Sequence, residues 1–210
     1  MRKTVIITGS KQGLGKYLAS VLNDDYNLIL CDRDYSGLSE YSFSVELPCN
    51  VSNKEEVETT VKAGLDKFGR IDVLINNAGL MLFDKFEDIK EEDLDAMYNV
   101  NVKGTLFFSQ AVLPIMKKQK GGYIINIGST RGITGAPTKG AYAMTKFGVR
   151  ALAETIFAEN KDYGIKTTTI CPGRLEKDLV TYQDIANTVN YLLSLGPQAH
   201  IKEIIIGGQL

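Results

Sequence analysis

Three side chains near the middle of the chain could together move a proton. Ser129 supplies a hydroxyl, Tyr142 a phenol and Lys146 an ammonium group. The ordinary pKa of a phenol is about 10, which is too high for proton transfer near neutrality. An ammonium one helical turn beyond Tyr142 favours the phenolate and lowers that pKa. We therefore expect Tyr142 to act as a general acid or base on an oxygen atom that Ser129 also hydrogen-bonds.

The pair of Tyr142 and Lys146 is weak evidence by itself. A chain of 210 residues with 10 tyrosines and 24 lysines and arginines contains about one such pair by chance. The elements around the pair must therefore support the chemistry. Residues 141–160 form a predicted helix that carries both side chains, and a predicted strand at 123–127 ends just before Ser129.

Short apolar segments alternate with amphipathic segments along the whole chain. Strands are predicted at 4–8, 27–31, 71–75, 123–127, 166–170 and 203–206, with a further one through Phe43, Val45 and Leu47. Helices are predicted at 13–23, 52–68, 91–118, 141–160 and 184–195, whereas a crossover helix after Asp32 is expected to be vestigial. The alternation predicts a single α/β domain over residues 1–210, a doubly wound, Rossmann-like parallel sheet with helices on both faces.

A glycine-rich segment joins the first predicted strand to the first predicted helix. Gly9 permits a tight turn, Gly13 lets the backbone approach a diphosphate, and Gly15 permits close packing of the helix. The helix N-terminus adds free N–H groups and a positive dipole. We expect this loop to bind a dinucleotide, with further contacts from Ser10, Lys11 and Leu14.

The second predicted strand ends at a residue that bears on the choice of dinucleotide. The Asp32 carboxylate can bind both hydroxyls of the adenosine ribose and repel a 2′-phosphate. Lys11 and Arg33 could instead pair with that phosphate. The sequence therefore favours NAD over NADP without excluding NADP.

The complete set of motifs resembles the short-chain dehydrogenase/reductase family, in its simpler non-extended branch, over nearly the whole chain. In family order the set comprises the three glycines, Asn-Asn-Ala-Gly at 76–79, Asn101, Ser129, Tyr142 and Lys146. The resemblance implies an NAD(P)-dependent oxidoreductase that interconverts an alcohol and a carbonyl. The implied catalytic residues are Asn101, Ser129, Tyr142 and Lys146.

The resemblance also assigns cofactor contacts and a proton path. It implies that Lys146 binds the nicotinamide ribose and that Asn101 holds a water continuing the path to solvent. Asn101 interrupts an apolar helical stripe, where a buried amide costs about 1–3 kcal/mol unless it is hydrogen-bonded. A helix-bending residue bonded to the backbone is the alternative. The remaining implied cofactor contacts are Asn50, Val51, Asn77, Ala78, Gly79, Pro172 and Gly173.

Four departures from the family pattern affect the expected site. Asn50 replaces the usual aspartate near the adenine, and its amide oxygen can still accept a hydrogen bond. No threonine follows Pro172 and Gly173 at the usual place, and the segment after Asp32 is short. The family's helical substrate lid is also shortened, because Gly173 is followed almost directly by the helix predicted at 184–195. We expect an open substrate side that excludes water poorly.

The composition limits the classes of partner. A net charge of -1 gives no sign of nucleic-acid or membrane-surface binding. Three cysteines without a CxxC pair favour a reducing context, and no apolar run reaches membrane-spanning length. With one histidine, we expect no metal site. The expected protein is cytoplasmic and acts on a small-molecule carbonyl or alcohol.

Other interpretations stay open at this stage. The chain could be a dinucleotide-binding sensor or partner-binding module with weak or no catalysis, because its lid is truncated. A nucleotide-sugar epimerase or dehydratase is disfavoured by the glycine spacing. The small residues of helix 141–160 favour a homodimer, as in similar proteins, although they could pack within one chain. An anionic substrate is a hypothesis, against simple solvated loop charges, for Arg131, Lys139, Arg174 and Lys177.

Overall fold

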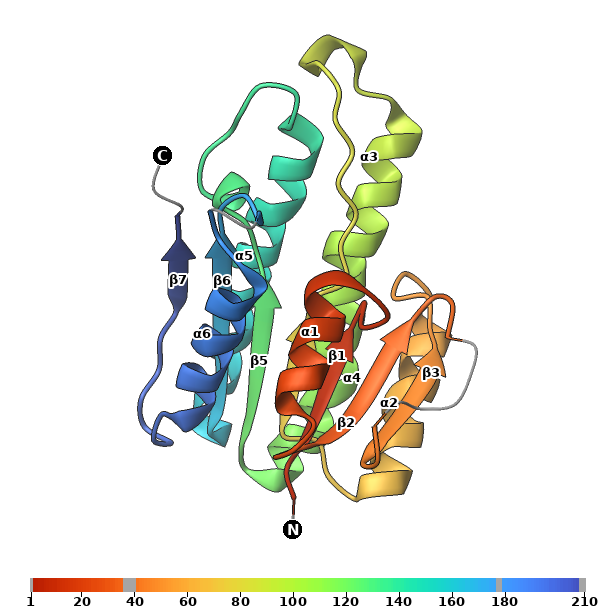
Figure 1. Ribbon diagram of the computed structural model, residues 1–210, viewed down its shortest axis with the longest axis vertical. Helices are drawn as coiled ribbons and strands as arrows, with labels where there is room; N and C mark the ends of the chain where they lie inside the picture. The colour runs from red at the N-terminus through yellow and green to blue at the C-terminus, as the bar shows by residue number, and fades with distance from the viewer. Residues whose placement is uncertain (1, 36–40, 177–178, 208–210) are drawn as a thin grey trace.

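The computed structural model describes residues 2–35, 41–176 and 179–207, whose strands form one seven-stranded sheet (Figure 1). All the pairings are parallel, in the order β3-β2-β1-β4-β5-β6-β7. The strands are β1 (Thr4–Thr8), β2 (Asn27–Asp32), β3 (Ser44–Pro48), β4 (Val73–Asn76), β5 (Gly122–Ile127), β6 (Ile165–Pro172) and β7 (Glu203–Ile206). The central strands are buried on both faces, which explains their continuous apolar runs.

The chain reverses its direction across the sheet at β1. From β1 it proceeds outward through β2 to β3 and then returns to β4, which pairs with the other side of β1. Ligands of such sheets bind in the crevice at the carboxyl ends of the strands beside this reversal. The predicted fold class, a doubly wound parallel sheet, is confirmed.

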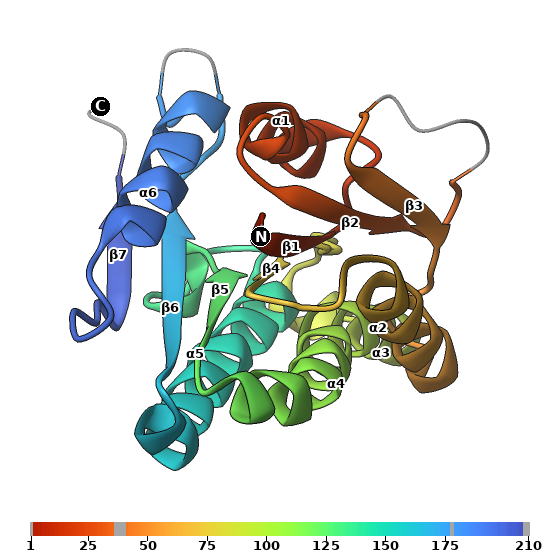
Figure 2. The same cartoon turned by 90° about the horizontal axis from the view of Figure 1, so that it is seen from below.

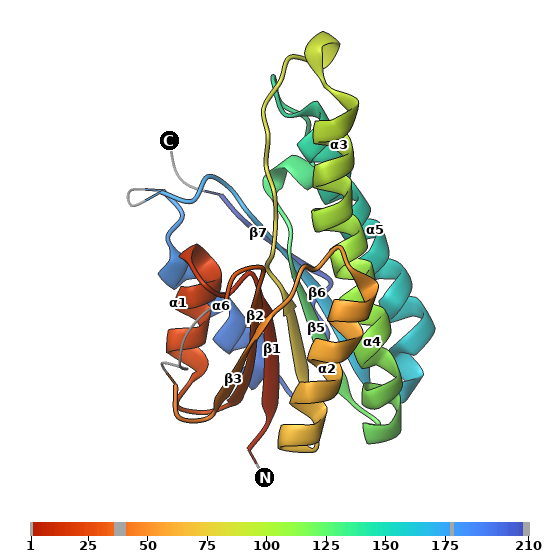
Figure 3. The same ribbon diagram turned by 90° about the vertical axis from the view of Figure 1, so that its right-hand side faces the viewer.

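Helices cover both faces of the sheet (Figure 2, Figure 3). One face carries α1 and α6, which pack around the core residues Ile7, Leu18 and Ile185. The other face carries α2, α4 and α5, and α3 projects beyond the carboxyl ends of the strands (Figure 3). The bounds are α1 (Gly13–Leu22), α2 (Lys54–Phe68), α3 (Glu91–Tyr98), α4 (Gly104–Gln119), α5 (Gly140–Asn160) and α6 (Tyr182–Ser194).

The helix predicted at 91–118 contains an irregular turn. A π-helical segment, Asn99–Lys103, joins α3 to α4. Such single wide turns occur often at functional sites. The prediction of a continuous helical stretch therefore needs a correction in its middle, at the residues that surround Asn101.

Two connections are short, as the sequence predicts. In the described residues after β2, at 33–35 and 41–43, there is no crossover helix. After β6, the described residues 173–176 and 179–181 contain only an isolated bridge between Leu175 and Val180 before α6 begins. In the described part of the chain, no helical lid precedes α6.

Candidate active site

Ser129, Tyr142 and Lys146 converge at the carboxyl end of β5. Ser129 caps a short 3-10 turn, and its Oγ accepts a hydrogen bond from the N–H of Arg131 at 3.1 Å. The side chain of Ser129 lies beside the Tyr142 phenol and acts to lower its pKa. Lys146 Nζ lies 5.8 Å from the centroid of the Tyr142 ring and donates to the carbonyl of Ile127 at 2.8 Å. The structure therefore brings the three side chains together.

The protein's own groups do not lower the pKa of Tyr142. Burial raises the pKa of the phenol above its ordinary value, and the Ser129 side chain offsets part of this rise. Burial also lowers the pKa of Lys146 to about 8. The Tyr142 pKa is therefore raised in this structure, and not lowered as the sequence predicts for Lys146 acting with a bound nicotinamide cation. The physical reason is that desolvation dominates, and the ammonium donates to the Ile127 carbonyl.

Asn101 lies in the π-helical turn, and both polar atoms of its side chain are hydrogen-bonded. Its Oδ1 accepts from the N–H of Leu80 at 2.7 Å. Its Nδ2 donates to the Leu80 carbonyl at 2.8 Å and to Thr145 Oγ1 at 2.9 Å. A Cβ added to Gly79 would lie 3.5 Å from Asn101 Oδ1 and 3.8 Å from Lys146 Nζ. Asn101 thus lies in an irregular helical turn. Its side chain joins the loop after β4 to α5, next to Lys146.

A cluster behind Ser129 was not predicted from the sequence. Cys171 Sγ accepts a hydrogen bond from the N–H of Ser129 and lies 3.7 Å from Glu203 Oε1. Burial raises the pKa of this thiol to about 11, so it is neutral. Arg150 binds Glu203 through two nitrogens and donates to the Gly132 carbonyl at 2.8 Å. The cluster links β7, β6 and α5 beneath the Ser129 loop.

The glycine loop has the geometry of a diphosphate cradle. Gly9 and Gly13 have φ angles of 65° and 57°, which favour glycine. A Cβ added to Gly15 would collide with the carbonyl oxygen of Gly9. In the described structure, Gln12 makes no side-chain cap bond to α1, whereas Asn53 caps α2. The first N–H groups of α1 are therefore available to an anion.

The segment after β4 holds the glycine loop in place. Asn77 Nδ2 donates to the carbonyls of Thr8 at 2.9 Å and Gly9 at 3.0 Å. The N–H groups of Asn77 and Ala78 both donate to Thr8 Oγ1 at 3.0 Å. The structure thus places Asn77 and Ala78 against the loop expected to bind the dinucleotide.

Two predicted cofactor contacts turn their side chains into the protein. The Ser10 hydroxyl lies 3.3 Å from the Cys31 carbonyl and 3.0 Å from the Tyr35 hydroxyl. Leu14 is buried in the core between the sheet and α1. Only the backbone groups of Ser10 and Leu14 are therefore left as contacts for a ligand.

Asp32 lies at the tip of β2 beside the glycine loop. Its carboxylate accepts hydrogen bonds from the N–H groups of Lys11 at 3.2 Å and Arg33 at 2.8 Å. The Lys11 ammonium pairs with Asp34 at 2.9 Å. Asp32 is therefore oriented by the backbone, and the charge of Lys11 already has an acidic partner.

A cavity of about 280 Å³ adjoins Asp32. Asn50 lies on its wall, and Asn50 Oδ1 accepts from the N–H of Ser52 at 3.1 Å, which leaves a second lone pair on that oxygen. Gln12, Cys49 and Leu80 also line the cavity and were not predicted. Its walls include the predicted contacts Gly9, Asp32, Arg33, Asn50, Val51, Asn77, Ala78 and Gly79.

The predicted cofactor contacts after β6 lie at the end of that strand. Pro172 is the last residue of β6, and the N–H of Gly173 donates to the Ile206 carbonyl at 2.8 Å. Arg174 forms an exposed ion pair with Glu176. The structure gives this arginine a partner within the chain.

The other loop cations also have contacts within the chain. Arg131 donates to the Gly135 carbonyl at 3.3 Å, and Lys139 Nζ lies 5.1 Å from the centroid of the Phe83 ring. Lys177 lies outside the described residues. The structure thus supports the anionic-substrate hypothesis less than the sequence does.

The chain was compared with known proteins. The family model described as short chain dehydrogenase matches residues 3–186. The chain belongs to the short-chain dehydrogenase family. An uncharacterized oxidoreductase of Staphylococcus aureus (strain USA300) is 32% identical over 223 residues, with 97% of this chain and 96% of the relative covered.

Solved structures agree with this assignment. The structure titled "ElxO with NADP Bound" has a TM-score of 0.89 and 29% identity, with 98% of each chain covered. An alcohol dehydrogenase from the archaeon Thermococcus sibiricus, complexed with 5-hydroxy-NADP, has a TM-score of 0.88 and 27% identity, with 98% of this chain and 96% of that chain covered. These similarities show a short-chain dehydrogenase fold and an oxidoreductase family, and they are consistent with the dinucleotide expected from the sequence.

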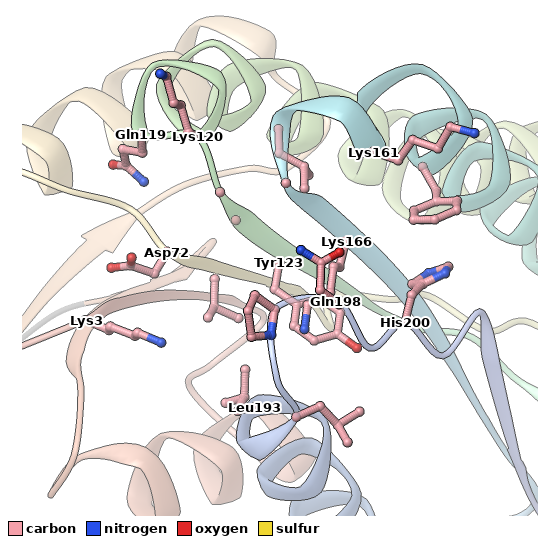
Figure 4. Close-up of a pocket in the computed structure, with 18 of the residues that line it drawn as sticks. Lys3, Asp72, Gln119, Lys120, Tyr123, Lys161, Lys166, Leu193, Gln198 and His200 are labelled. Carbon is pink, nitrogen blue, oxygen red and sulfur yellow. The ribbon is translucent and has the colours of Figure 1, made fainter.

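A cavity of about 750 Å³ lies at the amino ends of the strands of this short-chain dehydrogenase, opposite the candidate catalytic groups (Figure 4). Its cations have local structural partners. Lys120 and Lys161 follow the C-termini of α4 and α5, where positive charge is favourable. Lys166 donates to the Gly196 carbonyl at 3.3 Å, and Arg70 pairs with Asp72. We therefore do not assign this cavity to the dehydrogenase reaction.

Two kinds of feature are absent from the described residues of this dehydrogenase. No helix among them is long and apolar enough to cross a membrane. No group of three or more histidine, cysteine, aspartate or glutamate residues within them is arranged to hold a metal ion.

Proposed function

We propose that the chain is an NAD-linked oxidoreductase that interconverts a secondary alcohol and a carbonyl. The observation that carries this proposal is the convergence of Ser129, Tyr142 and the buried Lys146. These groups lie at the carboxyl end of the sheet, where this fold binds dinucleotides. Family membership makes oxidoreduction the reaction class, and the proton donor is this proposal's own assignment.

Each polar group has a stated role in the proposed reaction. Tyr142 gives its proton to the carbonyl oxygen or removes it in the reverse direction. Ser129 holds the same oxygen by a second hydrogen bond. Lys146 binds the nicotinamide ribose. Asn101 holds the loop at Leu80 in place, next to Lys146 and to the path along which protons reach solvent. The dinucleotide, when bound, supplies the hydride and, when oxidised, a positive charge that favours the Tyr142 phenolate.

NAD is the proposed physiological cofactor. Asp32 presents a backbone-oriented carboxylate to the cavity, and a 2′-phosphate there would meet its negative charge. Lys11 is neutralised by Asp34, which leaves Arg33 as the cation at that cavity wall. Two of the solved relatives carry NADP or a derivative of it. NADP is therefore the alternative cofactor, because Arg33 could pair with its 2′-phosphate.

The proposal is tested by a titration followed by a turnover assay. Isothermal titration calorimetry with NADH and NADPH measures which cofactor binds. A panel of ketones and aldehydes is then scored by loss of the reduced cofactor's absorbance. We expect tighter binding of NADH and turnover of at least one carbonyl. Failure of both cofactors to bind would contradict the proposal.

A second candidate is a dinucleotide-binding sensor with weak catalysis. It is favoured by the described residues between β6 and α6, which contain no helical lid. An active site without a lid excludes water poorly. Tight cofactor binding without turnover across the carbonyl panel would select this candidate.

We also propose that the protein acts as a homodimer through α5 and the preceding helical stretch, α3 and α4. Tyr98, Met144 and Phe147 are exposed on these helices. Ala143 and Ala153 of α5 are buried within the chain, so part of the small-residue surface serves internal packing. Light scattering after size-exclusion chromatography should give the mass of two chains, and Phe147→Glu should shift it to one. A monomeric wild type would reject this arrangement.

A further inference from the structure

The first turn of α6 reaches the glycine loop. Tyr182 is the first residue of α6, and its hydroxyl is the sole group within 4 Å of a Cβ built on Gly13, at 3.5 Å, in the described structure. Gly13 is the glycine at which this fold brings its backbone close to a diphosphate. A side-chain hydroxyl from the other end of the chain is therefore placed beside the expected diphosphate.

The position of Tyr182 is fixed by its neighbours. Thr181 and Asp184 form a capping box, in which Asp184 N–H donates to Thr181 Oγ1 at 3.2 Å and Thr181 N–H donates to the Asp184 carboxylate at 2.8 Å. The Tyr182 ring lies 6.0 Å from the ring of Tyr17 on α1, at 49°. Tyr17 in turn donates to Gln183 at 2.5 Å. Helices α1 and α6 lie side by side on the same face of the sheet (Figure 3).

The Tyr182 hydroxyl is free to donate. Among the described residues it makes no hydrogen bond, and the side chain is 40% exposed. The neighbouring Tyr17 hydroxyl differs, because it is occupied by Gln183. A free phenol beside the open N–H groups of the α1 N-terminus suits a phosphate oxygen, and hydrogen bonds to charged acceptors are the stronger ones.

We propose that the Tyr182 hydroxyl binds the diphosphate of the dinucleotide and so replaces a contact that a lid would otherwise supply. This inference rests on the proposed function. The connection after β6 makes it possible, because the described residues between Gly173 and Tyr182 contain an isolated bridge and no helical insertion. The contact comes from a capped helix and therefore requires no closing segment.

The test compares ligands with and without a diphosphate. Calorimetry or displacement of fluorescent NADH measures the Kd of NADH, ADP-ribose and adenosine for the wild type, Tyr182→Phe and Tyr191→Phe. Tyr191 is the matched control, because it is an exposed tyrosine on the same helix. We expect Tyr182→Phe to weaken NADH and ADP-ribose about tenfold, as for loss of a hydrogen bond to a charged group, and to leave adenosine within about twofold.

The outcomes separate this inference from the proposed function. An unchanged Kd of ADP-ribose for Tyr182→Phe would overturn the inference while the proposed function stands. An equal loss for adenosine would also overturn it, because the effect would then come from the shape of the loop. A wild type that binds no dinucleotide would instead remove the proposed function. Tyr191→Phe should match the wild type for all three ligands.

Discussion

The proton-transfer centre and the loop beside it differ in how they are held. Asn101, Lys146 and Ser129 are 1%, 5% and 9% exposed, and hydrogen bonds tie each to the backbone of another segment or of its own turn. The loop between β4 and α3 carries Met81, Phe83 and Phe86, which are 46%, 52% and 83% exposed. That loop extends beyond the carboxyl ends of the strands (Figure 3). The proposed catalytic groups are thus held in the core, whereas the apolar side chains of this loop are exposed at the surface.

This difference in burial and hydrogen bonding indicates where substitutions should have large effects. A group that is buried and hydrogen-bonded can be removed only by leaving its partners unsatisfied, which costs about 1–3 kcal/mol for each partner. Surface substitutions away from such networks usually change stability by less than about 0.5 kcal/mol. The predicted effects therefore decrease from the buried centre to the surface.

Lys146→Met should separate activity from stability. We expect turnover to fall by about 10²–10⁴-fold, as for loss of a group that assists acid–base catalysis. At pH 7 the free energy of unfolding should rise by about 1–3 kcal/mol, because a buried ammonium is removed. Carbonyl reduction and urea unfolding at pH 7 measure the two effects.

The pH dependence provides the control for that variant. The pKa of Lys146 in the folded chain is about 8, below the ordinary 10.5, so the unfolded chain binds more protons between these values. Wild-type stability should therefore rise with pH across this window, and the rise should be missing in Lys146→Met. The same slope in both proteins would show that Lys146 is not desolvated as the structure indicates.

Asn101→Ala should be the next largest change. It leaves the N–H and carbonyl of Leu80 without their partner and frees Thr145 Oγ1. The free energy of unfolding should fall by about 2–4 kcal/mol, and turnover should fall with it. Asn101→Asp is the matched variant, because a carboxylate still accepts from Leu80 but cannot donate. Equal stability of wild type and Asn101→Ala would contradict the anchoring role.

Glu203→Gln should have a smaller effect. The ion pair with Arg150 is half-buried and lies beneath the Ser129 loop, so its loss should cost about 1–2 kcal/mol of stability. Lys62→Ala removes an exposed pair with Asp66 on α2 and serves as the control, with a change below about 0.5 kcal/mol. Thermal unfolding of both variants measures the two losses of stability. Similar shifts in Tm would contradict the predicted difference between the variants.

The loop cations should contribute least. Arg131→Ala and Lys139→Ala remove side chains that already contact Gly135 and Phe83. We expect KM values for neutral and anionic carbonyl compounds to change by less than about twofold, in line with surface substitutions. A selective loss of affinity for anionic compounds would instead support the anionic-substrate hypothesis and make this surface part of the site.

Most of the fold follows from local sequence patterns. The buried central strands are short, largely apolar runs, and β7 occupies the predicted residues 203–206. Other boundaries differ by a few residues, as for β4, which begins at Val73 rather than at residue 71. The candidate site residues were predicted from the spacing of the motifs, and the family model matches residues 3–186.

Features that depend on distant contacts were not predictable. The ion pair of Arg150 and Glu203 joins residues 53 positions apart, and neither local sequence marks it. Nothing around Tyr182 indicates that it reaches Gly13. The direction of the Tyr142 pKa shift depends on how deeply α5 buries the phenol, which the Tyr-x-x-x-Lys spacing does not show.

The most direct test of the account is a comparison of the wild type with Tyr142→Phe. NADH binding is measured by calorimetry, and turnover of the best carbonyl from the panel is measured by loss of cofactor absorbance. The account predicts the same Kd for NADH within about threefold and a loss of turnover of about 10²–10⁴-fold. A Phe variant that binds NADH and keeps its turnover would contradict the assignment of Tyr142 as the proton donor.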